Sequence, residues 1–162
     1  MTTETAEQFI YREVSLLDQG LLWQWLELFT EDGRYWIPCN SDDGDPKSQV
    51  AIMYENRAGL TRRIARMERG RAVQEVRSRT CHVVSNIRVC AEPEHAADVS
   101  DECSVIMHSV MVIHETNRRR KQLFPGHCTY HLTSVGDSWQ IALKKLCLID
   151  NDQYYEDLSF LF

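Results

Sequence analysis

Hydrophobic residues recur at helical spacing in the first third of the chain. Between residues 6 and 17 the apolar positions fall three or four apart, as on one face of an amphipathic helix. Thr3 is the expected N-terminal cap of this helix, and Gly20 is its expected end. The pattern also predicts a short second helix over 22–29. A third helix is expected over 56–69, with Asn56 as its cap and Gly70 at its end.

The apolar period changes to two from about residue 79, which is typical of half-buried strands. Long strands are expected over 79–89, 103–115, 123–134 and 139–150, with a polar connection over 91–101 and a hairpin turn at 135–138. A shorter strand over 34–39 is expected after a turn at 30–33, and a brief apolar segment covers 50–54. Consecutive strands with short links predict an antiparallel meander. Helices followed by strands predict an α+β fold, with the helices packed on one face of a curved sheet.

Length and composition limit the number of domains and the expected location of the protein. The chain has 162 residues and 43% hydrophobic residues, and no internal repeat or linker is visible, so a single domain over 1–162 is expected. No apolar run reaches the roughly 18–20 residues that span a bilayer, so no membrane partner is expected. The polar, acidic N-terminus is unlike a leader peptide and predicts a cytoplasmic protein, in which the six cysteines stay reduced.

Charge is distributed unevenly along the chain, whose formal net charge is −6. Residues 1–46 hold two basic and ten acidic residues, whereas 57–88 hold nine arginines and two acids. A nucleic-acid footprint is one interpretation of the arginines. The absence of lysine in this stretch and the acidic remainder of the chain favour a solvated helix face or a protein interface instead. No nucleic-acid partner is therefore expected.

Metal-binding motifs are incomplete. Cys128 and His131 form C-x-x-H, which is half of a Rieske pattern. The matching C-x-H is absent from the sequence, since Cys81 and His82 are adjacent and have no residue between them. His127 and His131 are four apart on a predicted strand, so they share a face but lie ~13 Å apart by strand rise. The acidic loop at 40–48 lacks the Gly and Glu positions of a calcium-binding EF-hand. No catalytic, cofactor-binding or metal-binding residue is expected in this chain.

Acid–base chemistry is the alternative enzymatic interpretation. An α+β domain of this kind leaves a pocket between helices and sheet, which Asp32 and His82 could line together with Tyr35 and Trp36. The chain would then be a stand-alone dehydratase or isomerase. In the opposing interpretation Tyr35 and Trp36 are core aromatics beside a capping Asp32. A third possibility is a ligand-binding or assembly module of the same fold, with a pocket that lacks paired titrating groups.

Several blocks of the sequence, taken in order, resemble one known family. The matching blocks are 9–13 with 16–18, 25–29 with Asp32 and 35–38, 54–60 with Arg63, and 78–80 with His82 and 85–87. Together they resemble the small (beta) subunit of bacterial aromatic ring-hydroxylating dioxygenases, in the benzoate, anthranilate and salicylate branch. The loop between 39 and 50 is shorter than in some relatives, and the sequence does not identify the substrate.

The resemblance implies a fold, partners and cofactors. The fold would be the cystatin-like cone shared with nuclear transport factor 2 and scytalone dehydratase, with a largely antiparallel mixed sheet. The partner would be a large (alpha) subunit that carries a Rieske [2Fe-2S] cluster and a mononuclear Fe(II). In the usual assembly, three large and three small subunits hydroxylate an aromatic acid with O2 and electrons from NAD(P)H, and the ferredoxin or reductase acts on the large subunit. The small subunit would be structural, with Trp36, Arg57, Arg79 and Asn86 as structural or interface residues.

Overall fold

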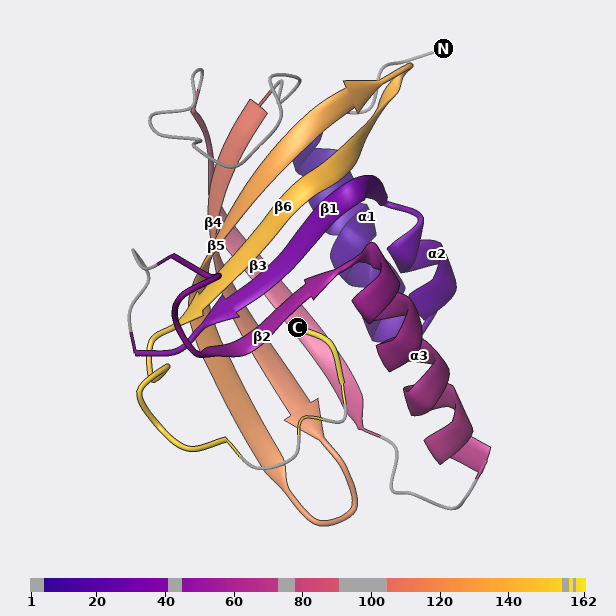
Figure 1. Cartoon of the computed structure of the whole chain (residues 1–162), viewed down its shortest axis with the longest axis vertical. Helices are drawn as coiled ribbons and strands as arrows, with labels where there is room; N and C mark the ends of the chain where they lie inside the picture. The colour runs from indigo at the N-terminus through magenta and orange to yellow at the C-terminus, as the bar shows by residue number, and fades with distance from the viewer. Residues whose placement is uncertain (1–4, 41–44, 73–77, 91–104, 156–157, 159) are drawn as a thin grey trace.

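The computed structural model in Figure 1 describes all residues except 1–4, 41–44, 73–77, 91–104, 156–157 and 159. Its first helix, α1 (Ala6–Gln19), begins at a reciprocal cap. The Thr5 hydroxyl accepts the main-chain N–H of Gln8 at 3.1 Å, and the Gln8 side chain accepts the N–H of Thr5 at 3.0 Å. Thr5 is therefore the cap, while Thr3 lies outside the described residues. Gly20 ends the helix with a φ of 70°, as expected.

The other two helices are α2 (Leu22–Leu26) and α3 (Arg57–Ala72). The side-chain oxygen of Asn56 accepts the main-chain N–H of Gly59 at 2.9 Å, which confirms the predicted cap of the third helix. The expected end at Gly70 was wrong, because the helix continues to Ala72. Glycine lowers helix stability without forbidding the conformation.

Six strands form one mixed sheet in the order β2-β1-β6-β5-β4-β3. They are β1 (Phe29–Pro38), β2 (Ala51–Asn56), β3 (Arg79–Cys90), β4 (Val105–Thr116), β5 (Lys121–Val135) and β6 (Ser138–Leu148). The last four form the predicted antiparallel meander. The first strand pairs parallel to β6 and antiparallel to β2, which makes the sheet mixed.

The first strand begins earlier than the sequence pattern indicates. Residues 30–33 were expected to form a turn, but they lie within β1. Phe29 is fully buried, packs edge-on against Trp25 at 4.8 Å between ring centroids and pairs with Ile141 of β6. The pairing with β6 shifts register between Phe29 and Arg34, so the polar residues between them are accommodated as an irregularity of the strand.

The third strand contains a second irregularity. Its pairing with β4 shifts between Ser85 and Arg88, and Asn86 adopts a φ of 54°. This left-handed conformation is uncommon outside glycine, although asparagine tolerates it better than most residues. The two-residue alternation seen in the sequence is therefore interrupted at this point of β3.

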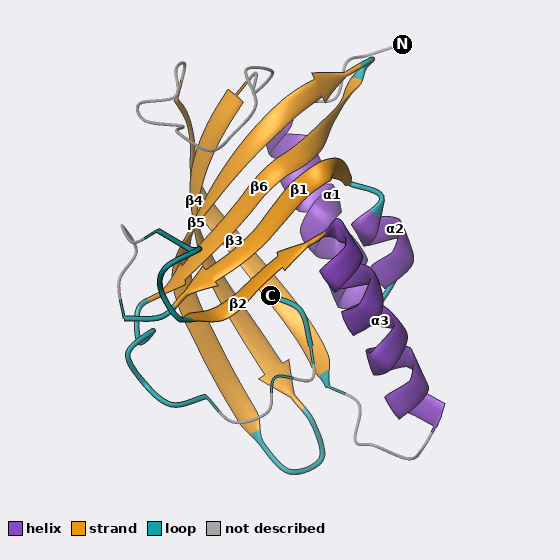
Figure 2. Ribbon diagram, in the orientation of Figure 1, coloured by secondary structure: helices purple, strands orange, loops and turns teal. Residues whose placement is uncertain are grey.

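The two faces of the sheet have different surroundings. The helices lie on one side, as Figure 2 shows, and the apolar core fills the space between them and the sheet. No described helix covers the opposite side, which we call the outer sheet face. It is defined by Trp36, Arg88, His108, His127, His131 and Lys145, which strand register places on the same side. None of the described helices is long and apolar enough to cross a membrane.

Candidate functional site

A charged pair lies buried inside the cone. The ammonium Nζ of Lys144 on β6 is 2.8 Å from a carboxylate oxygen of Glu13 on α1, and both side chains are fully buried. Trp25 Nε1–H and the hydroxyl of Tyr130 also donate to the Glu13 carboxylate. Lys144 donates in addition to the main-chain oxygen of Phe162 at 2.8 Å. A buried ion pair is tolerated only when further hydrogen bonds satisfy its members, as they do here.

This pair is not apparent from the sequence, although a signal exists for each member. Glu13 lies on the helix face that carries Ile10 and Leu17. Lys144 shares its strand face with the buried residues Leu146 and Leu148. A single charge on an otherwise apolar face indicates a buried partner of opposite charge. The sequence alone does not pair two such residues that are 131 positions apart.

Burial keeps three other titratable groups of the interior, Tyr35, Tyr130 and Cys128, neutral. It raises the pKa of Tyr35 and of Tyr130 well above the usual value of 10.0. Burial likewise raises the pKa of the Cys128 thiol to about 12, partly opposed by the charge of Lys144. A thiol with that pKa carries almost no thiolate at neutral pH and is a poor nucleophile. The interior groups are therefore hydrogen-bonding and packing groups.

His82 has a carboxylate partner other than the one expected. Its Nδ1 lies 2.6 Å from one oxygen of Asp18, and its main-chain N–H donates to the other oxygen at 2.9 Å. Asp32 is exposed on β1, and three strands separate β1 from β3 in the sheet. The structure therefore does not bring Asp32 and His82 together.

The Asp18–His82 pair links the end of α1 to the start of β3. Burial by itself would raise the pKa of Asp18, but hydrogen bonds from His82 and Thr80 and the charge of His82 lower it below its usual value. The His82 ring is fully buried, and its Nε2 has no hydrogen-bond partner among the described residues.

Two of the four expected interface residues lie on or beside the outer sheet face. Trp36 is half-buried there, with its ring edge-on to Tyr54 and the Lys145 ammonium 4.5 Å from its centroid. Asn86 borders a hollow of about 600 Å³ in the same face, beside His108 and His127. The irregularity in β3 thus shapes the rim of this hollow.

The other two expected residues lie elsewhere. Arg57 forms an ion pair with Glu27 at 2.9 Å and donates to the main-chain oxygen of Phe29, so it ties α3 to the α2–β1 connection. Arg79 is exposed at the first position of β3. The contacts of Arg57 are internal to this chain.

The outer sheet face is rich in basic and imidazole groups. Burial, together with the charges of His108 and Lys145, lowers the pKa of His131, so its ring is neutral at physiological pH. The residues that β4, β5 and β6 contribute to this face include no Asp or Glu among those described. A surface of this composition suits an acidic partner.

The two residues of the C-x-x-H motif, Cys128 and His131, lie on opposite faces of the sheet. Cys128 is buried on the core side of β5, while His131, three positions later, lies on the outer sheet face. Across the described ranges, no three His, Cys, Asp or Glu side chains lie close enough together to hold a metal ion.

The described elements define a class of proteins, namely cones in which helices pack against a mixed, curved sheet. A solved structure from Novosphingobium aromaticivorans, described as an NTF2-like protein with a cystatin-like fold, superposes with a TM-score of 0.57 at 16% identity, over 88% of this chain and 79% of that chain. The beta subunit of benzoate 1,2-dioxygenase from Burkholderia mallei superposes with a TM-score of 0.74 at 24% identity, over 99% of this chain and all of that chain. These likenesses confirm the predicted α+β, cystatin-like fold.

The sequence identifies the family within that class. A family model described as the ring hydroxylating beta subunit matches residues 12–153. The 2-halobenzoate 1,2-dioxygenase small subunit of Burkholderia cepacia is 32% identical over 156 residues, covering 91% of this chain and 88% of the relative. The chain belongs to the family of ring-hydroxylating beta subunits, which confirms the resemblance to the small subunits of aromatic ring-hydroxylating dioxygenases.

Proposed function

We propose that this chain is the non-catalytic subunit of a terminal oxygenase that hydroxylates an aromatic acid in the cytoplasm. Its role is to support large subunits that carry the Rieske cluster and the mononuclear iron. The relatives are named as dioxygenase small subunits, several of them for aromatic acids. The described titratable groups of the interior serve internal contacts, and none of the described cysteines forms a disulfide, which fits a reducing compartment.

The outer sheet face is the surface that we assign to the large subunit. The observation that carries this assignment is that the described residues of β4–β6 contribute no acidic side chain to the face, which carries Arg88, Lys145 and the imidazoles of His108, His127 and His131. Trp36 adds a half-buried aromatic group, and aromatic and arginine side chains are enriched in protein interfaces. An acidic surface on the large subunit would complement this face.

Co-purification with the large subunit tests the proposal. A large subunit of the family is tagged and co-expressed with this chain, and recovery of the two chains is compared for Arg88→Glu and Arg62→Glu. Both arginines are exposed, but Arg88 lies on the outer sheet face and Arg62 on α3. We expect Arg88→Glu to weaken association roughly tenfold or more and Arg62→Glu to leave it unchanged.

The opposite pattern would place the interface on the arginine-rich helix α3, and equal recovery of both variants would refute a charged interface at either place.

The non-catalytic role is tested separately by assaying the purified chain alone for iron and for hydroxylation of benzoate. Turnover by this chain without a large subunit would overturn the proposed function. Replacing His82, its structural partner Asp18 or the originally expected Asp32 tests the dehydratase or isomerase alternative, which requires loss of turnover in a chain that remains folded.

A further inference from the structure

The last residues of the chain fold back into the cone. Phe160, Leu161 and Phe162 are 4%, 2% and 0% exposed, although they belong to no helix or strand. Phe160 and Phe162 pack against each other and against Phe124 of β5, with ring centroids 4.7 to 5.3 Å apart. A segment without regular structure thus fills part of the core.

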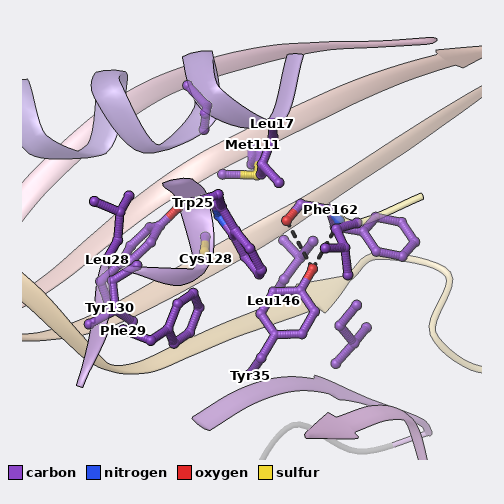
Figure 3. Packing of buried hydrophobic residues seen from close by; sticks show 14 of the residues in the cluster. Leu17, Trp25, Leu28, Phe29, Tyr35, Met111, Cys128, Tyr130, Leu146 and Phe162 are labelled. Carbon is purple, nitrogen blue, oxygen red and sulfur yellow. Dashed lines mark hydrogen bonds between the residues drawn. The ribbon is translucent and has the colours of Figure 1, made fainter. Parts of the chain in front are cut away.

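Buried polar groups hold the main chain of Phe162. The Tyr35 hydroxyl donates to its main-chain oxygen and accepts its main-chain N–H, both at 2.9 Å, as the dashed lines in Figure 3 show. Lys144 Nζ donates to the same oxygen at 2.8 Å. Tyr35 and Lys144 are fully buried, so these contacts form in the low-dielectric interior, where hydrogen bonds are electrostatically stronger.

The groups that bind Phe162 are positioned by the rest of the fold. Lys144 is on β6 and is fixed by Glu13, which Trp25 and Tyr130 hold in turn. Tyr35 is on β1, and its ring is edge-on to Trp25, with 5.7 Å between centroids. None of these positioning contacts involves residues 160–162. The binding groups are therefore held by contacts that do not include their occupant, as in a preorganised ligand-binding site.

We propose that the interior of the cone is a binding site for an N-acylated aromatic unit, occupied in this structure by Phe162 of the same chain. The ligand class follows from the contacts: an aromatic ring against Phe124, an amide N–H for Tyr35, and an oxygen for Tyr35 and Lys144 together. The site does not depend on the oxygenase role proposed above. A tethered occupant has a high effective concentration, so the intact chain excludes competing ligands of this class.

Cutting the folded chain tests the proposal. A protease recognition sequence is inserted between Gln153 and Tyr154, where Tyr154 is 89% exposed, and the protein is cleaved after folding. The probe is the acetylated, fluorescently labelled peptide of residues 158–162. We expect the cut protein to exchange its own fragment for the probe in a saturable manner, while the uncut protein does not bind the probe.

Matched variants show whether the assigned contacts are responsible. Tyr35→Phe removes both hydrogen bonds of the hydroxyl and is expected to weaken probe binding about tenfold or more. Tyr54→Phe removes a tyrosine hydroxyl from β2, away from Phe162, and is expected to bind the probe like the parent. N-acetyl-phenylalaninamide should compete with the probe, whereas N-acetyl-leucinamide, which lacks the ring, should not.

Several results would overturn the inference. They are loss of the fold on cleavage, release of the fragment without uptake of the probe, equal binding by Tyr35→Phe and Tyr54→Phe, and equal competition by the two amides. A second measurement uses the cleaved full chain, whose melting temperature should rise on addition of excess peptide if the site binds it. Failure of the probe to bind would leave the association with a large subunit untouched, so the two proposals are separable.

Discussion

The buried pair of Glu13 and Lys144 predicts a large, specific effect of one substitution on stability. Lys144→Met keeps most of the side-chain volume but leaves the Glu13 carboxylate buried without a cation. Removing one partner of a buried ion pair costs about 3 to 5 kcal/mol of unfolding free energy. For a chain of 162 residues this corresponds to a fall in melting temperature of roughly 6 to 20 °C.

A double variant separates the buried charge from lost packing. Glu13→Gln combined with Lys144→Met removes both charges, while the Gln oxygen can still accept from Trp25 and the Gln NH2 can donate to the Tyr130 hydroxyl, which then acts as acceptor. We expect the double variant to recover about 2 kcal/mol or more of the loss seen for Lys144→Met, because replacing both members of a buried pair is far less costly than removing one. Lys145→Met is the matched control. It is the next residue on β6 but lies on the outer sheet face, and it should lose no more than about 1 kcal/mol through its contact with Trp36.

Urea unfolding followed by tryptophan fluorescence measures these differences, since Trp25 contacts the pair directly. Far-UV circular dichroism at each urea concentration checks that the transition is two-state. A loss below about 1 kcal/mol for Lys144→Met, or a double variant no more stable than that single variant, would refute the view that charge pairing governs the interior.

Three further predictions concern single positions. Burial raises the pKa of Cys128 to about 12, so this thiol should resist iodoacetamide in the folded protein, while the exposed Cys81 reacts. Mass spectrometry of the labelled peptides measures both reactions, and labelling of Cys128 before Cys81 would contradict its burial. Gly126→Ala should destabilise the chain by about 1 to 3 kcal/mol in urea unfolding, because a Cβ there would lie 2.6 Å from the main-chain oxygen of Cys147. An unchanged urea midpoint would show that β5 and β6 move apart easily at this point. Asp18→Asn should cost about 1 to 2 kcal/mol near neutral pH. Because the hydrogen bonds from His82 hold the folded-state pKa of Asp18 below 3.8, this difference from the parent should persist down to about pH 4 and shrink as the pH falls further, and a difference that grows on acidification would have the wrong sign.

The elements that the sequence predicted well are those with local signals. Gly20 ends α1 and Asn56 caps α3, because each acts on main-chain groups only a few residues away. The meander of β3 to β6 follows from alternation and short connections. The start of β1 was missed because the anchor at Phe29 is a packing contact, and polar residues at 30–33 dominate the local pattern.

The site residues were harder to predict than the elements. Asp18, the partner of His82, lies 64 positions away in the sequence. Asp32 carries the same carboxylate group, but it lies on β1, whereas His82 lies on β3. The contact of Phe162 with Tyr35 spans 127 positions. Pairing of this kind depends on the register and curvature of the whole sheet, which no short window of sequence encodes.

The two faces of the sheet carry different kinds of polar groups. On the inner side, the charge of Lys144 is matched by Glu13, and its remaining hydrogen-bonding capacity, like that of Tyr35, is directed to Phe162. These groups are positioned by one another and hold the tail inside the cone. On the outer side, basic and imidazole groups face outward from β4, β5 and β6, and the described residues that these strands contribute to this face include no carboxylate. Since a surface that carries groups of one charge sign directs association with a partner of opposite charge, the outer side is where this subunit should recognise another chain.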